Sequence, residues 1–133
     1  MKVNVTKLDA RLGDTIPMPT YGSAGAAAID LRAVIGDPVT IGAGESALIG
    51  TGLAFHIENK NYVGMIAPKF TLAKDDKIIL GNSIGIINSD STSELKVLLL
   101  NRGSASFTVH AGDEIAQFFI VPVQSVEMDL TSE

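Results

Sequence analysis

The chain has 133 residues, a formal net charge of −5 and no cysteine. The acidic balance excludes a general nucleic-acid binder, which needs a basic face, and the missing thiols exclude disulfides and cysteine-ligated metals. A hydrophobic content of 46% excludes a disordered chain, and one domain of this length can bury roughly two-thirds of its unfolded surface.

The N-terminal half of the sequence predicts short strands. The first ten residues, MKVNVTKLDA, alternate apolar and polar side chains without the apolar core of a signal peptide, so we expect a strand there. Residues 23–28, SAGAAA, suit a buried strand or a turn where backbones pack closely. Residues 46–57, SALIGTGLAFHI, are predicted as one strand kinked at Gly50 and Gly52.

The C-terminal half continues the same pattern. Further strands are predicted at 62–67, 84–88, 95–100, 107–110 and 114–123. Only the sequence FTLAKDD at 70–76 is compatible with a helical turn. Turn signals recur about every 8–12 residues, the spacing of an all-β sandwich or barrel. We therefore predict one all-β domain over residues 1–133, soluble because no apolar run approaches the ~18–20 residues of a membrane span.

Patterns of reactive residue types give no clear catalytic site by themselves. His56 and His110 each lack a neighbouring ligand at metal spacing, so no zinc site is predicted. The sequence GNSIG matches the G-x-S-x-G nucleophile turn, but Ser83 leads into a predicted strand and not a helix, so the match is coincidental. Asp30 and Arg32 alternate on one predicted strand and are expected to form a structural charge pair.

Taken in order, segments covering almost the whole chain resemble the trimeric dUTP pyrophosphatase (dUTPase) family. They are PMPTYGSAGAAAIDLRA (17–33), TGLAFHI (51–57), APKFTLAKDDKIILGN (67–82), GNSIGIINSDSTSEL (81–95), LNRG (100–103) and GDEIAQFFIVPV (112–123). The resemblance implies a β jelly-roll of the β-clip type. It also implies a homotrimer with three active sites at the subunit interfaces, in which dUTP is hydrolysed to dUMP and diphosphate.

The third motif departs from the family at the positions closest to the chemistry. Family enzymes use an aspartate there to activate the attacking water, and Asn88 occupies that position in this sequence. A carboxamide is not basic near neutral pH and cannot take the proton of that water. Ser91 stands where the family has a tyrosine beneath the deoxyribose, and Asp90 matches the family's second acidic position in the turn. The resemblance therefore implies that no catalytic residue is retained in this motif.

The phosphate-binding motifs depart as well. The usual P-R-S-G of the second motif is PKFT here, so Lys69 keeps a positive charge but lacks the fork of an arginine. Phe70 replaces a small hydroxyl donor and is expected to fill space. Glu114 replaces the arginine before I-A-Q, which is a charge reversal. The sequence ends at VEMDLTSE without the glycine-rich C-terminal arm of the family's fifth motif.

Other family positions are matched. Asn82 matches a residue that helps the hairpin recognise uracil, Gln117 a phosphate-side amide, and Asp30 the acid that holds magnesium through water. Each also has a structural explanation: a turn for Asn82, a hydrogen bond across the subunit interface for Gln117, and pairing with Arg32 for Asp30. Asn82, Gln117 and Lys69 are thus candidate vestigial substrate-binding residues, and Asp30 is the candidate metal ligand. No cofactor is expected, except Mg²⁺ if the chain hydrolyses dUTP.

These departures lead us to expect a catalytically inactive homotrimer, a pseudoenzyme that serves as a structural or binding module. A decoration (cement) protein on a viral capsid is its most concrete form. One alternative is a dUTP diphosphatase with Asp90 or Glu94 as the base, and Lys69 with Lys74 or Lys77 on the phosphates. Another is a nucleotide-binding regulator. The expected location is the cytoplasm, or the virion for a capsid protein, with no membrane and no general nucleic-acid partner.

Overall fold

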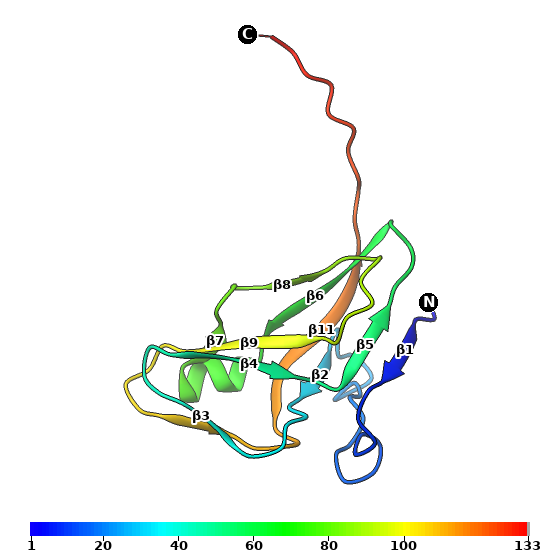
Figure 1. Cartoon of the computed structure of the whole chain (residues 1–133). Coiled ribbons are helices and arrows are strands. Elements are labelled where there is room, and N and C mark those ends of the chain that lie inside the picture. The colour runs from blue at the N-terminus through cyan, green and yellow to red at the C-terminus, as the bar shows by residue number, and fades with distance from the viewer. Residues whose placement is uncertain (133) are drawn as a thin grey trace.

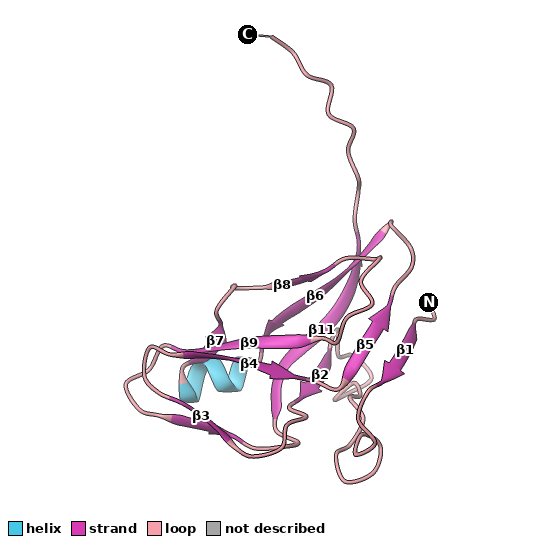
Figure 2. Cartoon of the chain, in the orientation of Figure 1, coloured by secondary structure: helices cyan, strands magenta, loops and turns pink. Residues whose placement is uncertain are grey.

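The computed structural model describes residues 1–132 and confirms the all-β prediction (Figures 1 and 2). In chain order the elements are β1 (Asn4–Lys7), β2 (Ile29–Arg32), β3 (Val39–Ile41), β4 (Ser46–Gly50), β5 (Leu53–His56), β6 (Tyr62–Pro68), a π-helical turn η1 (Leu72–Asp76), β7 (Ile78–Leu80), β8 (Gly85–Ile87), β9 (Lys96–Asn101), β10 (Phe107–Val109) and β11 (Glu114–Pro122). The predicted helical turn forms as η1. No helix in residues 1–132 has the length and hydrophobicity needed to cross a membrane.

The strands form small antiparallel sheets in which distant parts of the chain meet. The largest sheet has the order β2-β11-β6-β8, a second has the order β4-β9-β7, and two further pairs are β1-β5 and β10-β3. The longest strand, β11, lies between β2 and β6: its first half pairs with β2, and residues 116–122 pair with β6. It therefore brings residues 29–32 beside residues 62–68, and with them the side chains of the candidate site.

A single hydrophobic core joins the two larger sheets. Buried core side chains from their strands include Leu31, Ile49, Ile66, Leu80, Val97, Leu99 and Phe118. Phe118 of β11 also packs against Phe55 of β5, with ring centroids 4.4 Å apart in a tilted arrangement. The same strand thus anchors both the largest sheet and the smaller β1-β5 pair.

The predicted single strand over 46–57 is instead two strands in different sheets. Gly52 separates β4 from β5 and has a φ of +69°, in the left-handed region that favours glycine. A Cβ at this position would lie 2.9 Å from Cδ1 of Leu12, so the leucine side chain would have to shift to admit it. The backbone therefore breaks where the sequence pattern predicts only a kink.

The small-residue run at 23–28 forms turns and not a closely packed strand. Most of its residues are exposed, and a Cβ added at Gly25 would meet no atom within 4 Å. The predicted turn is therefore confirmed, whereas the predicted burial and close packing of backbones at this run are wrong. The small side chains instead keep the rim of an adjacent cleft open.

Asn101, at the end of β9, is fully buried and all three of its side-chain hydrogen bonds go to the backbone. Its Nδ2 donates to the carbonyl oxygens of Ile41 at 2.9 Å and of Ala105 at 2.8 Å. Its Oδ1 accepts from the amide of Gly103 at 2.9 Å. This one amide therefore ties β9 to β3 and to the turn that leads into β10.

We predict that Asn101→Ala lowers the free energy of unfolding by about 3 kcal/mol, because three buried backbone groups lose their partners. Chemical denaturation followed by circular dichroism measures the change. The matched control is Asn61→Ala at an exposed position, for which we expect a change within about 0.5 kcal/mol. Equal effects at the two positions would contradict the role given to Asn101.

Candidate functional site

A polar cleft of about 320 Å³ opens where β2, β6 and β11 lie side by side. Its lining residues come from the small-residue turn, from β2, from the end of β6 and from β11: Gly22, Ser23, Ala26, Ala28, Asp30, Lys69, Phe70, Thr71 and Gln117. The register pairs Gln117 with Asp30 on one side and with Ala67 on the other. The structure thus brings together the predicted residues of the first, second and fourth motifs.

A β-bulge in β11 decides which of its side chains face this cleft. Glu114 is opposite Arg32 and Ala116 is opposite Leu31, so Ile115 is an extra residue in the ladder. Without the bulge, Glu114 and Gln117 would point to opposite faces of the sheet, because side chains alternate along a strand. With it, Glu114 lies on the same face as Gln117, Asp30 and Arg32.

Four charged side chains form one ion-pair network on that face. Nζ of Lys69 lies 3.1 Å from Oδ1 of Asp30 and 3.1 Å from Oε2 of Glu114. The other oxygen of Glu114, Oε1, accepts from Nη2 of Arg32 at 3.3 Å, and Nη1 of Arg32 donates to the carbonyl of Gly112 at 2.8 Å. The predicted Asp30–Arg32 pair is therefore wrong, because the bulge puts Glu114 next to Arg32 and leaves Asp30 to Lys69.

Lys69 is held firmly in its charged form. Its partial burial lowers the pKa of the ammonium group, but hydrogen bonds to Glu114 and then Asp30 outweigh that effect and raise the pKa above its usual value. The ammonium group is therefore charged at every physiological pH. In the protein alone, this charge is paired with the carboxylates of Asp30 and Glu114.

Gln117 and Phe70 line the cleft in ways that the sequence does not predict. Nε2 of Gln117 donates to the carbonyl of Pro68 at 3.1 Å within the same protomer, so this donor is engaged locally and the expected bond across an interface is not needed to explain it. Phe70 is 72% exposed and stands at the rim. The prediction that this ring fills space in the site is therefore wrong, because the ring stays at the rim and leaves the cleft open.

Of the third-motif residues, Asn88 and Ser91 lie toward the other end of the sheet, whereas Asn82 precedes β8 on the side where β6 ends. Asn82 is in the exposed turn before β8, Asn88 directly follows β8, and the amide of Ser91 donates to the carbonyl of Asn88 at 3.1 Å. Ile87 of β8 is opposite Gly64 of β6, so Asn88, the next residue, lies about six strand residues along β6 from Lys69. At the rise of a β-strand, this separation is roughly 20 Å. One protomer alone does not bring Asn88 and Ser91 to its own polar cleft.

The structure also narrows the set of alternative catalytic groups. Oε2 of Glu94 accepts from the amide of Gly52 at 2.9 Å and so supports the β4–β5 break. Lys74 lies on η1 near Asp75, and Nζ of Lys77 donates to the carbonyl of Lys74 at 2.9 Å. None of the three lines the polar cleft. Asp90 is exposed in the turn after β8.

The protein offers few ligands for a resident metal. Among residues 1–132, no group of three or more His, Cys, Asp or Glu side chains is placed to hold an ion. His56 contacts the hydroxyl of Thr6 through Nε2 at 2.7 Å, and His110 lies 3.8 Å from a carboxylate oxygen of Asp113. Asp30 is the one family-matched candidate that lines the cleft, and its Oδ1 already contacts Lys69.

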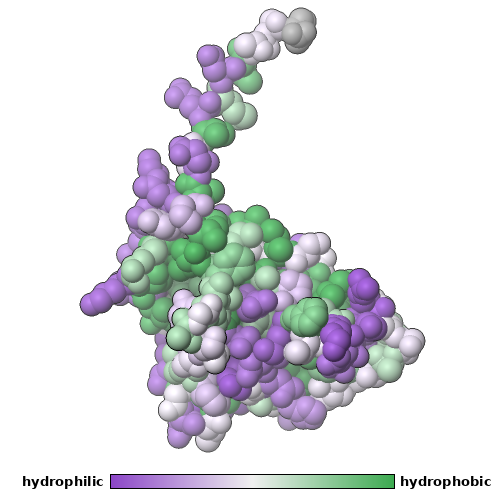
Figure 3. Space-filling model, turned by 180° about the vertical axis from the view of Figure 1, so that it is seen from behind, coloured by the Kyte–Doolittle hydropathy of each residue, from purple (hydrophilic) through white to green (hydrophobic). Residues whose placement is uncertain are grey.

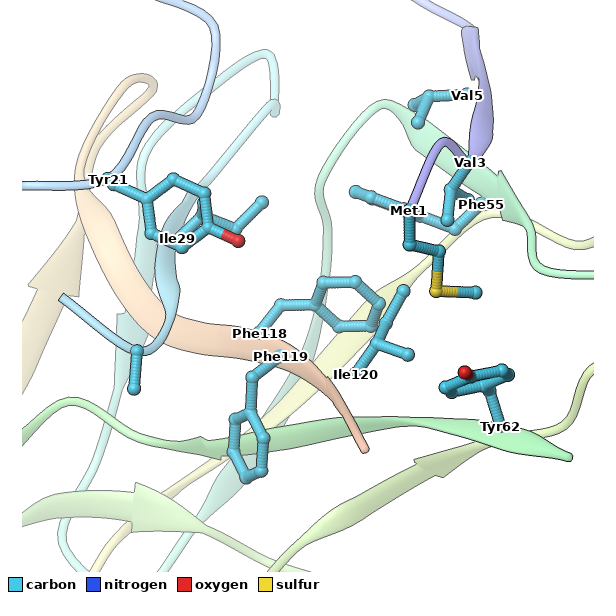
Figure 4. A pocket seen from close by; sticks show the side chains of 11 residues that line it. Met1, Val3, Val5, Tyr21, Ile29, Phe55, Tyr62, Phe118, Phe119 and Ile120 are labelled. Carbon is cyan, nitrogen blue, oxygen red and sulfur yellow. The ribbon is translucent and has the colours of Figure 1, made fainter. Parts of the chain in front are cut away.

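A second, apolar pocket of about 410 Å³ lies beside β11 and has no counterpart in the sequence-based expectations. Phe118 and Ile120 of β11 point into it, with Met1, Tyr21 and Tyr62 around it (Figure 4). Figure 3 shows a hydrophobic area on the rear face of the molecule, below the C-terminal tail. The residues of the pocket come from separate parts of the chain, so no local pattern signals it.

The C-terminal tail leaves the body of the protein after β11 and extends away from it (Figure 1). Its apolar side chains alternate with polar ones, and Val126, Met128 and Leu130 are each at least 80% exposed. Such alternation is typical of a strand that packs one face against a surface. Through residue 132, the tail packs against no such surface within the protomer.

Comparison with known proteins identifies the family of this chain. The dUTPase family model matches residues 14–133. The deoxyuridine 5'-triphosphate nucleotidohydrolase of Alcanivorax borkumensis is 43% identical over 128 residues, covering 96% of this chain and 85% of that protein. The protein of the same name from Idiomarina loihiensis is 42% identical over 132 residues, covering 99% and 87%.

Solved structures confirm the fold. The dUTPase of Staphylococcus bacteriophage 80alpha superposes with a TM-score of 0.85 at 19% identity and covers 99% of this chain and 97% of that one. The dUTPase of phage phi11 of S. aureus gives 0.85 at 18% identity, covering 100% and 97%. At this level of identity the likeness shows the shared fold alone.

The expectation of a catalytically inactive structural module is wrong on this comparison. Relatives at 41–43% identity over nearly the whole chain are named as nucleotidohydrolases, and not as structural or capsid proteins. Differences at single motif positions therefore do not place the chain outside the sequence family of these relatives. By its sequence and its fold, the chain belongs to the dUTPase family.

Proposed function

We propose that the protein is a dUTP nucleotidohydrolase that converts dUTP to dUMP and diphosphate. The observation that carries the proposal is identity of 41–43% to enzymes of that name along almost the full chain. The polar cleft supports it, because the cleft combines a cation, an amide and a carboxylate from three motifs of the family. These are the groups that a triphosphate and its counter-ion require.

In this proposal Lys69 binds phosphate oxygens as a point charge, and Gln117 contributes an amide at the same end of the cleft. Positioning and charge stabilisation supply most of the rate enhancement in phosphoryl-type chemistry. Asn82 takes the family position at the uracil, and Ser91 lies at the sugar with a hydroxyl in place of an aromatic platform. We therefore expect weaker discrimination against UTP than an aromatic residue at position 91 gives.

The proton of the attacking water needs an acceptor other than Asn88. Glu94 is engaged with the amide of Gly52, whereas Asp90 is exposed two residues beyond Asn88. We propose that Asn88 orients the water through its carboxamide and that Asp90 takes the proton. The water oxygen then bonds to the α-phosphorus, and the bond to the diphosphate leaving group breaks.

The proposal requires an oligomer, and we infer a homotrimer from the family. The polar cleft and the Asn88–Ser91 turn lie roughly 20 Å apart in one protomer, so a complete site combines the cleft of one copy with the turn of another. The unfilled apolar pocket and the alternating tail are further surfaces suited to contact between copies.

Magnesium fits the proposal as an ion carried by the nucleotide. Mg²⁺ is usually bound through one or two carboxylates together with substrate phosphates and water. Asp30, with its side chain 30% exposed at the cleft, is the residue that would contact its hydration shell. When bound, the ion would neutralise phosphate charge, while Lys69 and Gln117 orient the triphosphate.

We predict that Asp90→Asn lowers the rate of dUTP hydrolysis by about 10²–10⁴, the usual effect of losing a general base. Chromatographic measurement of dUMP in the presence of Mg²⁺ provides the rate. The matched control, Asp37→Asn at another exposed position, should keep the wild-type rate. Saturable dUTP binding by the wild type without any dUMP would contradict the hydrolase proposal and support a nucleotide-binding regulator.

A second prediction concerns Asn88. Because aspartate can take the proton that asparagine cannot, Asn88→Asp should raise kcat above the wild-type value. Steady-state kinetics with dUTP tests this. An unchanged kcat would show that position 88 does not face the attacking water.

A third prediction tests whether the site is shared between copies. Lys69→Ala and Asp90→Asn should each be nearly inactive alone, while co-expression of the two should restore measurable hydrolysis. Some sites of the mixed oligomer then combine an intact cleft with an intact turn. Analytical ultracentrifugation of the same sample gives its oligomeric state. Restoration would not occur if each protomer built its site alone.

A further inference from the structure

The two cations on the cleft face of the sheet are both engaged by one carboxylate. Oε2 of Glu114 lies 3.1 Å from Nζ of Lys69, and Oε1 lies 3.3 Å from Nη2 of Arg32. The four side chains of this network are between 26% and 35% exposed, so solvent and a ligand can reach them. A phosphate group can contact two cations in the same way as this carboxylate, with two oxygens bonded to one central atom.

Lys69 is the only cationic residue among those lining the cleft. Its ammonium has a limited number of donors, three in all, and two of its contacts are carboxylates at 3.1 Å. One donor thus remains for a phosphate, and a phosphate that takes more than this one donor must replace a carboxylate. Asp30 belongs to β2 and lines the cleft, whereas Glu114 reaches Lys69 from β11 because of the bulge.

We infer that Glu114 is an internal competitor that sets the affinity of the cleft for the phosphates of a nucleotide. The inference rests on the proposed function, since it concerns how the same cleft takes an oligophosphate. Glu114 neutralises Lys69 and Arg32 in the free protein, and an incoming phosphate displaces its carboxylate. The affinity for the ligand is lower by the free energy of the ion pairs that the ligand must break.

The effect is moderate, because the network is partly exposed to water. Ion pairs with this degree of exposure are weakened by the high dielectric and screened by salt. The competition therefore favours ligands with several negative charges, which regain more than they displace. A triphosphate meets this condition better than a monophosphate, so Glu114 also supports discrimination between substrate and product.

Glu114 could instead position Lys69 for phosphate binding, and this role predicts the opposite change in affinity. If Glu114 served to hold Lys69 in the position that binds phosphate, its removal would weaken binding. If Glu114 competes with phosphate, its removal strengthens binding. The sign of the change in affinity separates the two roles.

The test is isothermal titration of inorganic triphosphate into the wild type and into Glu114→Gln. This probe contains neither uracil nor sugar and reports on the cleft without any hydrolysis of dUTP. We expect Glu114→Gln to lower the Kd by about three- to tenfold at low salt, with a smaller change at high salt. The KM of Glu114→Gln for dUTP should also be lower than that of the wild type.

Two further variants complete the experiment. Glu58→Gln removes the same charge at an exposed position after β5 and should leave the Kd for triphosphate unchanged. Glu114→Asp keeps the charge but shortens the side chain, so its Kd should lie between those of Glu114→Gln and the wild type. It also tests the inference if Glu114→Gln does not fold.

An unchanged or higher Kd in the Glu114 variants would overturn the inference, whether or not the wild type hydrolyses dUTP. Tighter binding of triphosphate by a protein that leaves dUTP intact would support the inference while the proposed function fails. The same tightening in Glu58→Gln would reduce the effect to net charge and would also overturn the inference.

Discussion

The pairing of β11 with β2 and β6, and the bulge within that pairing, determine the rest of this structure. Nine residues of β11 hold two strands that are distant in sequence. Phe118 on the core face packs with Phe55, while Gln117 on the other face lines the cleft. The extra residue, Ile115, shifts the alternation of side chains by one and turns Glu114 toward Lys69 and Arg32.

The charge distribution of the cleft follows from that shift. A face with Lys69 and Arg32 alone would be strongly cationic, and a face with Asp30 and Glu114 alone would be anionic. The network joins all four, so the cleft is close to neutral before any ligand binds. Because Lys69 is charged at every physiological pH, the balance depends on which carboxylates reach it and not on its protonation.

The error about function has an instructive origin. The prediction of an inactive protein rested on the combined departures from the family at Asn88, Ser91, Phe70 and Glu114. Identity over the whole chain includes the strands and turns that position every other group, and it places the protein in the dUTPase family. Family membership is thus carried by the entire framework and not by the residues at a few motif positions.

The sequence by itself determined the all-β class, most strand positions, the helical turn and the family, because side-chain alternation and turn residues act locally. It also singled out Asp30, Lys69 and Gln117 through their family positions, and the structure shows that these three line one cleft. Only the tertiary structure decided that Gly52 splits a strand in two, that Asp30 pairs with Lys69, and that Glu94 supports a turn. The pairing of Asp30 depends on strand register and on the extra residue in β11, and all three outcomes depend on packing between segments far apart in the chain.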